Sequence, residues 1–332
     1  MVTNQFGDKT EKDRILEALL LDTAKDLGGV LPSAAELAQK VRQMQLGLPA
    51  EDEFTAMCAW SGKCSLIQKI DTETIVASKD FKLPDILLII RHSNKEMPIL
   101  VQVKTTYQKR KLVFTESYFA RLNGYAETLG LPILVAWKIK DFGLWTLFEL
   151  AHMAKKRTAF HIDFAEAFKQ DLFGVLLDEI CFVLKKGTSI VMEIRKDKAI
   201  SQKRFIGTIT DFYLTNPTGE RISVKEVPYF HTLFVCGNDD VSIEETENLL
   251  IEKFTLIEDQ LVKGFSALPT LLTRGNRDKE SKIAWRGVIR SSDLLRAYQD
   301  VVLTINTALE KGLIRYIIHV EPHHRPEFLD SL

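Results

Sequence analysis

Three residues in the first third of the chain, Asp85, Gln102 and Lys104, have the types and spacing needed to hold a divalent cation beside a phosphate. Asp85 directly precedes the apolar run 86–90, and a polar turn separates that run from a second apolar run, 99–103. Two apolar runs joined by a polar turn predict a β-hairpin. Because successive side chains of a strand point to opposite faces, Gln102 and Lys104 share one face of the second strand.

The chemistry that these residues could support is hydrolysis of a phosphodiester bond. This reaction needs an activated water, stabilisation of charge on the phosphoryl oxygens and help for the leaving alkoxide, and Mg²⁺ can supply all three. Asp85 would be the charged ligand, Gln102 would offer its amide oxygen, and the backbone carbonyl of Val103 could add a third oxygen. Lys104 would orient or deprotonate the water, or stabilise the developing negative charge, and we favour the electrostatic role.

The pattern resembles the PD-(D/E)XK nuclease superfamily, with Pro84, Asp85, Gln102 and Lys104 as its motif. Gln102 stands where the family has its second acid, and this Gln-x-Lys form is similar to that of restriction enzymes of the Mrr type. The same two residues would also suit a half-buried hairpin with a polar outer face, which is the plainer alternative.

The elements that surround the motif extend the resemblance over residues 50–150. A strand is predicted at 66–70, a helix at 115–129 and two further strands at 133–138 and 144–150, with Gly130 stopping the helix. This order looks like the catalytic cores of archaeal Holliday-junction resolvases and Mrr-like enzymes. The resemblance implies an α/β fold with a restriction-endonuclease-like core, in which helices flank a mixed central sheet.

A further carboxylate could come from the helix predicted before the first strand, at 51–60. Members of the superfamily often add a glutamate from this helix, and Glu53 is our first choice, with Glu51 as the second. Acids in the first turn of a helix are also favourable without any metal, because they interact with the helix dipole. Both interpretations of Glu53 stay open at this point.

The middle of the chain is basic. Residues 80–210 hold 21 Lys and Arg against 14 Asp and Glu, whereas the whole chain has a net charge of −1. A nucleic-acid surface confined to this part would explain the asymmetry, and so would an ordinary solvated rim. The candidate phosphate contacts near the predicted core are Lys109, Arg110, Lys111, Arg121, Lys138 and Lys140.

The patterns divide the chain into four parts. Residues 1–48 are predicted to be helical, with two helices that resemble half of a helix-turn-helix module. Residues 49–150 form the nuclease-like core, 151–224 a β-rich extension, and 225–332 an α/β C-terminal domain. Within the last part, a capping box of Ser242 and Glu245 predicts a long helix that ends near Val262.

Composition limits the classes of protein that need to be considered. No apolar run approaches the roughly 20 residues needed to cross a bilayer, and the polar start lacks the apolar core of a signal peptide. The chain is therefore expected to be cytoplasmic and away from membranes. Its four cysteines have no CxxC spacing, which argues against a zinc ribbon.

Two functional hypotheses follow. The resemblance implies an endonuclease that depends on Mg²⁺ or Mn²⁺ and cuts DNA in restriction, defence or mobile-element processing; RNA is not distinguished from DNA. It also implies a homodimer, and the C-terminal domain offers a surface for a protein partner. Gln102 keeps open the alternative of a nuclease fold that has lost catalysis and binds nucleic acid or assembles with protein partners.

Overall fold

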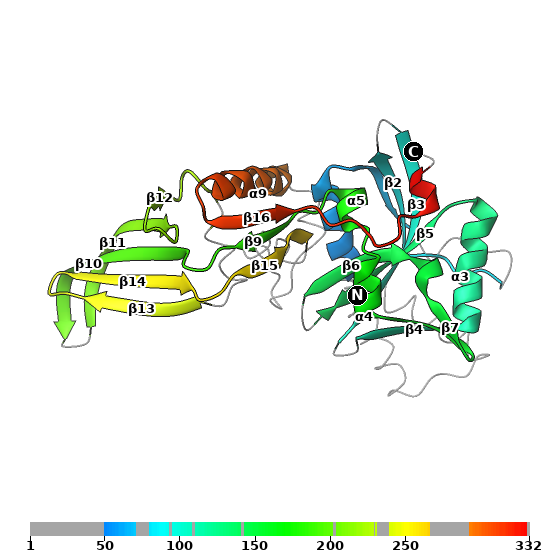
Figure 1. Cartoon of the computed structure of the whole chain (residues 1–332), viewed down its shortest axis with the longest axis horizontal. Coiled ribbons are helices and arrows are strands. Elements are labelled where there is room, and N and C mark those ends of the chain that lie inside the picture. The colour runs from blue at the N-terminus through cyan, green and yellow to red at the C-terminus, as the bar shows by residue number, and fades with distance from the viewer. Residues whose placement is uncertain are drawn as a thin grey trace, which may run out of the picture.

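The computed structural model describes residues 50–70, 80–92, 95–107, 110–140, 143–201, 204–228, 230, 239–265 and 292–330. The helices predicted within residues 1–48 lie outside these ranges. The described chain is elongated, with the central sheet and α3 in one lobe and the strands β10 to β14 at the far end of the other (Figure 1).

The larger lobe is built on a five-stranded sheet with the order β1-β2-β3-β5-β6. Its strands are β1 (Cys64–Lys69), β2 (Ile86–His92), β3 (Lys95–Thr106), β5 (Ile133–Ile139) and β6 (Leu144–Glu149). Only the β3–β5 pair is parallel, and the other neighbours are antiparallel. The sheet is therefore mixed. This confirms the predicted α/β class, in which helices flank a mixed central sheet and further β-rich segments follow.

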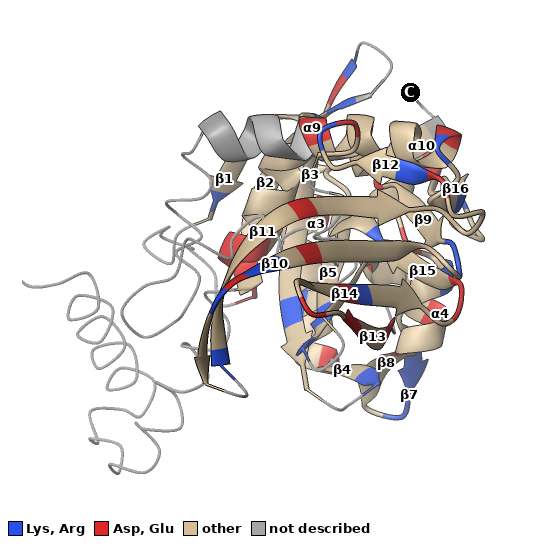
Figure 2. Ribbon diagram, turned by 90° about the vertical axis from the view of Figure 1, so that its left-hand side faces the viewer, with Lys and Arg blue, Asp and Glu red and all other residues tan. Residues whose placement is uncertain are grey.

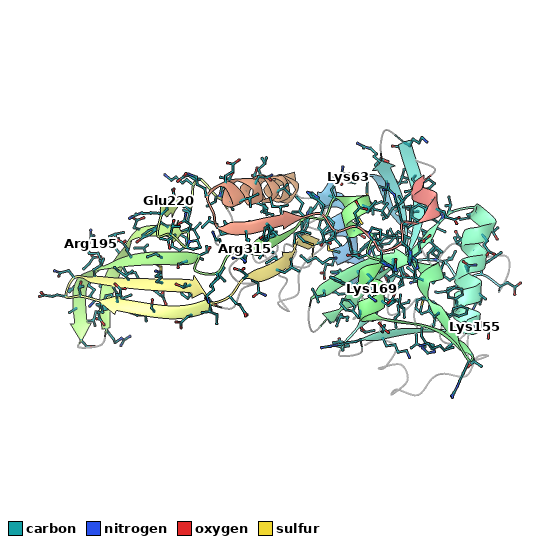
Figure 3. All side chains as sticks on the ribbon, in the orientation of Figure 1. Lys63, Lys155, Lys169, Arg195, Glu220 and Arg315 are labelled. Atoms are coloured by element: carbon teal, nitrogen blue, oxygen red, sulfur yellow. The ribbon has the colours of Figure 1, made fainter. Side chains whose placement is uncertain are left out.

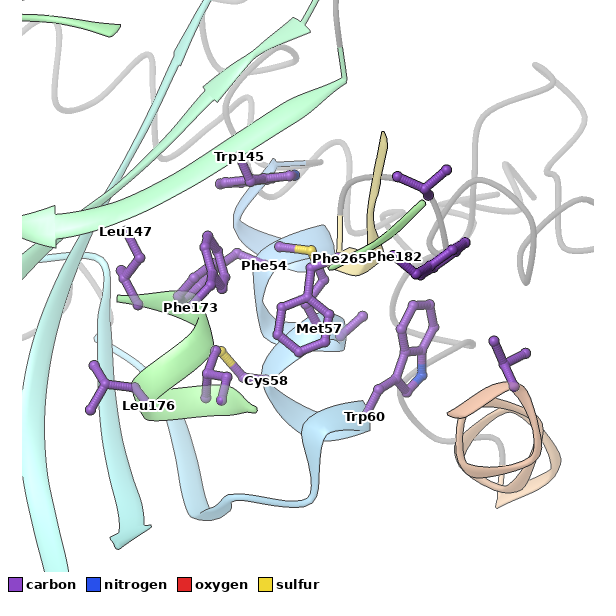
Figure 4. Packing of buried hydrophobic residues seen from close by; sticks show 14 of the residues in the cluster. Phe54, Met57, Cys58, Trp60, Trp145, Leu147, Phe173, Leu176, Phe182 and Phe265 are labelled. Atoms are coloured by element: carbon purple, nitrogen blue, oxygen red, sulfur yellow. The ribbon is translucent and has the colours of Figure 1, made fainter. Parts of the chain in front are cut away.

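Helices cover both faces of this sheet. The helix over residues 50–61 packs Phe54, Met57 and Trp60 into a core that includes Trp145 and Phe173 (Figure 4). On the other face lies α3 (Glu116–Leu129), whose buried residues include Leu122. Because both faces are covered, β3 is buried along most of its length, as expected for a central strand.

Local signals fix the ends of α3 where the sequence predicts them. The hydroxyl of Thr115 accepts a hydrogen bond from the backbone N–H of Tyr118 at the start of the helix, and Gly130 adopts a left-handed conformation after its end. The segment that contains α3 is the crossover between the parallel strands β3 and β5, which pair with Gln102 beside Val135.

A small sheet that the sequence analysis did not identify lies beside the start of α3. Its order is β4-β8-β7, formed by β4 (Lys111–Thr115), β7 (Ala154–Lys156) and β8 (Ala159–Asp163). After β6 the chain also forms the 3-10 turn η2 (Leu150–His152) and two short helices, α4 (Phe164–Lys169) and α5 (Phe173–Leu177).

The second lobe contains two further sheets. One has the order β12-β11-β10-β14-β13 and is formed by β10 (Ser189–Ser201), β11 (Arg204–Thr215), β12 (Arg221–Ser223), β13 (Asp239–Glu245) and β14 (Leu249–Leu256). The other has the order β15-β9-β16 and combines β9 (Cys181–Leu184), β15 (Gln260–Lys263) and β16 (Ile314–Ile318). The helices α9 (Ser292–Glu310) and α10 (Glu327–Asp330) complete the described chain.

The long helix predicted from Ser242 to Val262 is wrong, because this segment forms β13, β14 and β15. Val241 and Ile243 alternate with polar residues at a period of two, and Phe254 of β14 pairs with Ile190 of β10. Pairing with a distant strand therefore overrides the local capping signal. These pairings join the segments on either side of residue 224, and the four-part division of the chain stays a prediction.

A buried ionic cluster connects the two lobes. The ammonium of Lys263 lies 2.6 Å from Asp171 and 2.7 Å from Glu179, and it donates to the backbone carbonyl of Trp145 over 3.0 Å. Lys263 belongs to β15 and Trp145 to β6, so this one side chain links the second lobe to the central sheet. Across the parts of the chain that the structure describes, no helix is both long and apolar enough to span a membrane.

Candidate metal centre at the end of the central sheet

Asp85 lies at the start of β2, directly opposite Gln102 of β3. Ile86 pairs with Val101, and the backbone N–H of Asp85 donates to the carbonyl of Val101 over 3.0 Å, which extends the ladder by one residue. Opposed residues in an antiparallel pair share a face, so Asp85, Gln102 and Lys104 all belong to the α3 side of the sheet. The structure thus brings these three predicted residues together.

The carboxylate of Asp85 is held by two donors from β3. Its Oδ2 accepts the backbone N–H of Val103 over 2.6 Å and also accepts a hydrogen bond from the amide Nε2 of Gln102. These bonds fix the orientation of the carboxylate relative to the strand. They leave Oδ1 as the oxygen for which no such bond is found among the described residues.

Gln102 presents a buried oxygen that lacks a hydrogen-bond partner among the described residues. The side chain is 1 % exposed, and its Oε1 finds no hydrogen-bond donor among the described residues. A buried polar atom without a partner is costly, and such atoms are rare unless they serve a ligand, an ion or a water. The amide oxygen is the atom of Gln102 that a hard cation would bind.

The helix over 50–61 brings Glu51, and not our first choice Glu53, toward this group. Burial and the negative charge of Asp85 raise the pKa of Glu51, and Lys69 and Lys104 partly oppose the shift. The ammonium of Lys69 lies 3.7 Å from the Glu51 carboxylate and forms a closer ion pair with Asp52. Glu51 is therefore the second carboxylate in the electrostatic environment of Asp85.

Glu53 is engaged on another side of the helix. Its Oε1 accepts the indole N–H of Trp145 over 2.9 Å, and its other oxygen pairs with Lys138. Two residues along a helix correspond to a rotation of about 200° around its axis. The carboxylates of Glu51 and Glu53 therefore point to nearly opposite sides of the helix. The observed contacts give Glu53 a structural role at β5 and β6.

Lys104 lies above two aromatic rings. Its ammonium is 5.1 Å from the ring centroid of Tyr118 and 6.0 Å from that of Phe114. Aromatic faces attract cations at these distances, so the two rings stabilise the charged ammonium and restrict its position. Both rings come from the segment where β4 ends and α3 begins.

Burial changes the acid–base properties of Asp85. Its removal from water raises the pKa of the carboxyl group, although Lys104, the N–H of Val103, Lys82 and Lys69 favour the charged form. Two carboxyl groups with raised pKa values, Asp85 and Glu51, therefore lie in one electrostatic environment. A bound cation would relieve the cost of ionising both of them.

The donor set fits a hard divalent cation better than a transition metal held by His and Cys. In the described part of the chain, no group of three or more His, Cys, Asp or Glu is arranged to hold a metal ion. Mg²⁺ accepts a site with one or two carboxylates and other oxygens, because it keeps several waters. The backbone carbonyl of Val103, which accepts a 3.4 Å bond from Gln102 Nε2, is a candidate third ligand.

The predicted phosphate contacts are spread over different environments. Lys109 lies outside the described residues, and Lys111 is exposed on β4. Arg121 of α3 donates to the backbone carbonyl of Phe81 over 2.9 Å, which fixes the segment that leads into Asp85. Its guanidinium thus supports the local backbone in the structure.

Two more of these cations lie near the end of β5. Lys138 is the partner of Glu53, and Lys140 lies 5.2 Å from the ring centroid of Tyr107. Burial and the neighbouring charge of Lys138 lower the pKa of Lys140. Arg110 directly precedes β4, where its backbone carbonyl accepts the N–H of Phe164.

Comparisons with known proteins give a distant structural likeness and no match to a family or a curated protein. No model of a known protein family matches the chain, and no curated protein is a significant match. Among solved structures, the chain is similar to Hjc of Archaeoglobus fulgidus, a Holliday junction resolvase from an archaeal hyperthermophile. The identity is 19 %, the TM-score is 0.26, and the match covers 32 % of this chain and 79 % of that chain. This likeness is too distant to assign a function, so the chemistry has to be inferred from the residues of the site.

Proposed function

We propose that this chain is a metal-dependent endonuclease that hydrolyses phosphodiester bonds in DNA. The observation that carries the proposal is the meeting of Asp85, Gln102 and Lys104 on one face of the sheet, with Gln102 Oε1 buried and lacking a partner among the described residues. A half-buried acid, a buried amide oxygen and a lysine therefore meet at the end of this hairpin. They are the groups required to bind a cation next to a phosphate.

In this proposal the metal ligands and the lysine have separate roles. Asp85 and Gln102 bind Mg²⁺ or Mn²⁺, and Glu51 takes the place that the sequence analysis gave first to Glu53. Lys104, held over Phe114 and Tyr118, stabilises negative charge on the phosphoryl oxygens and orients the attacking water. The cation, when bound, lowers the pKa of that water and stabilises the leaving alkoxide.

The test is cleavage of supercoiled plasmid DNA by the full chain during a titration with Mg²⁺ or Mn²⁺. The Asp85→Asn variant keeps the size and hydrogen-bonding shape of the side chain but removes its charge. We expect nicking or linearisation by the parent and a loss of at least about 100-fold in the variant. Equal cleavage by Asp85→Asn and the parent would exclude this site.

The alternative is a nuclease fold without catalysis that binds nucleic acid or assembles with protein partners. The observation that favours it is the amide at position 102, which donates to Asp85 where an acid would add a second negative charge. Binding of DNA with no cleavage at any metal concentration would support this alternative. Restriction, defence or mobile-element processing is the biological setting that the resemblance implies for the first function, and a homodimer is its implied assembly.

A further inference from the structure

Three consecutive basic residues occupy the tip of the hairpin formed by β7 and β8. Lys155 and Lys156 end β7, Arg157 follows in the turn, and all three are exposed. Lys156 pairs with Ala159, so the connecting loop consists of Arg157 and Thr158 alone. Lys155 extends from the edge of the larger lobe in Figure 3, and the strand that carries it is marked as basic in Figure 2.

The tip is held against the start of α3. The backbone N–H of Glu116 donates to the carbonyl of Thr158 over 3.2 Å, and the Glu116 carboxylate pairs with Lys155. Beneath the hairpin, the rings of Phe160 and Phe119 stack with their centroids 3.6 Å apart. The basic residues are therefore displayed on a fixed support rather than on a free loop.

This support is the segment that also positions Lys104. Phe114 and Tyr118, whose rings lie beneath the Lys104 ammonium, flank Glu116 in the chain. The hairpin tip and Lys104 thus contact the same five-residue segment, 114–118. The tip consequently lies at the end of the lobe where the candidate metal centre is.

The backbone at Arg157 is unfavourable for an arginine. Its φ is +57°, in the left-handed region, and the first position of a two-residue hairpin loop favours glycine for this reason. The requirements of the turn therefore do not explain an arginine here. A residue kept in a conformation that costs free energy points to a role for its side chain.

We propose that Lys156 and Arg157, supported by Lys155, bind the phosphate backbone of duplex DNA on one side of the bond that is cut. This inference rests on the proposed nuclease function, since it places a second contact along the same substrate. A guanidinium binds phosphate through two parallel hydrogen bonds, and exposed lysines add charge without sequence preference. The hairpin would fix the path of the duplex across the site.

The test is the binding of a fluorescently labelled duplex DNA to the full chain at a series of KCl concentrations. Every protein that is compared carries Asp85→Asn, so that the DNA is not cleaved. Lys156→Ala combined with Arg157→Gly removes both cations and gives the turn the residue that it prefers. Each lost phosphate contact should lower the slope of log Kd against log salt by about 0.9. We expect a slope smaller by about 2 and weaker binding at low salt.

The matched control is Lys185→Ala combined with Lys186→Ala, which removes the same charge from the turn between β9 and β10 in the other lobe. This double variant should leave the slope of log Kd against log salt unchanged. An equal decrease of the slope in both double variants would overturn the inference, because the loss of net charge alone would then explain the decrease. If Arg157→Gly fails to fold, Arg157→Asn replaces it, since Asn also tolerates the left-handed region. Thermal unfolding of each variant checks the fold.

The results separate this inference from the nuclease proposal. Unchanged affinity and slope in the hairpin variant, while the parent cleaves plasmid, would refute the hairpin contact and leave the nuclease intact. Weaker binding in the hairpin variant, with a parent that never cleaves, would refute the nuclease and keep the DNA surface. A slope change seen with single-stranded RNA and not with duplex DNA would overturn the assignment of the partner.

Discussion

Glu51 and Asp85 lie close enough that the charge of Asp85 is, after burial, the largest cause of the raised pKa of Glu51. Glu51 comes from the first turn of a helix and Asp85 from the residue before a strand, so the fold brings two half-buried carboxyl groups into one electrostatic environment. Repulsion of this kind is a common feature of sites that bind cations or share a proton.

The first prediction separates Glu51 from Glu53. Glu51→Gln should weaken the binding of Mn²⁺ about tenfold or more, because it removes a charged ligand or a close neighbour of one. Glu53→Gln should leave metal affinity unchanged and lower the free energy of unfolding by about 1–3 kcal/mol, because Lys138 loses its charged partner. Titration calorimetry with Mn²⁺ and denaturant unfolding measure the two quantities. Equal loss of Mn²⁺ affinity in both variants would contradict the assignment.

The second prediction concerns pH. Folding raises the pKa of Asp85 above 3.8 and that of Glu51 above 4.5. Without metal, the folded chain therefore binds more protons than the unfolded chain at pH values above these. The contribution of the two groups to stability consequently falls as the pH rises from these values toward the raised pKa values. Metal binding needs both carboxylates ionised, so it releases protons and strengthens as pH rises. The increase in melting temperature caused by Mg²⁺ should therefore vanish in acid and grow toward neutral pH.

The control for this pH dependence is Asp85→Asn, in which one of the two titrating groups is absent. Its melting temperature should respond little to Mg²⁺ at any pH. A metal-induced increase that is the same at acid and neutral pH in the parent would show that these carboxyl groups are not the ligands.

The third prediction tests the amide at position 102. Gln102→Glu adds a carboxylate beside Asp85 in a position that is 1 % exposed, so the variant without metal should lose about 1–3 kcal/mol of stability. Mg²⁺ should restore the lost stability and preserve or increase cleavage, because a charged oxygen ligand replaces a neutral one. Denaturant unfolding with and without Mg²⁺ gives the comparison. If the added metal restores no stability, position 102 does not face the cation.

Much of the site can be predicted because its residues lie on adjacent strands of one hairpin. The apolar runs and the polar turn indicate β2 and β3, and the register that pairs Ile86 with Val101 places Asp85 opposite Gln102. The position of Lys104 on the same face then follows from the period of two along a strand. Local patterns are sufficient for these three residues, because their strands are neighbours in the chain and carry clear apolar runs.

The choice between Glu51 and Glu53 could not be made from local patterns. The two acids flank the buried side of the helix, where Phe54 and Met57 pack into the core, on opposite edges. One edge faces Lys69 of β1 and the other faces Trp145 of β6. Which edge meets the metal-binding end of the sheet depends on how the helix is placed over the strands, and no periodicity in the sequence reports that placement.

The basic hairpin was missed for a related reason. Its strands β7 and β8 are short, and β8 pairs with β4, which is only five residues long and lies between a basic stretch and a helix. Three adjacent cations are visible in the sequence at 155–157. The left-handed backbone at Arg157 and the contact with Glu116, which distinguish this group from an ordinary exposed loop, are properties of the folded chain.

The last prediction concerns the cluster that joins the lobes. Lys263, Asp171 and Glu179 are 7 %, 2 % and 2 % exposed, so Lys263→Met would leave two buried carboxyl groups without their cation. Such a loss costs about 3–5 kcal/mol, whereas Lys169→Met, which breaks the exposed pair with Glu166, should cost less than about 1 kcal/mol.

Burial raises the pKa of Glu179 from 4.5 to about 7 despite the attraction of Lys263, and Asp171 adds to the rise. Folding therefore favours the protonated form of Glu179, and its contribution to stability falls as pH rises between those values. Without Lys263 the pKa of Glu179 rises further. Between pH 4.5 and about 7 Glu179 is protonated in both folded proteins, so the difference in unfolding free energy between the parent and Lys263→Met should stay nearly constant. Above pH 7 Glu179 ionises in the parent alone, so this difference should widen. Chemical denaturation from pH 4.5 to above pH 7 measures the difference, and a difference that does not widen above pH 7 would mean that Glu179 is not coupled to Lys263.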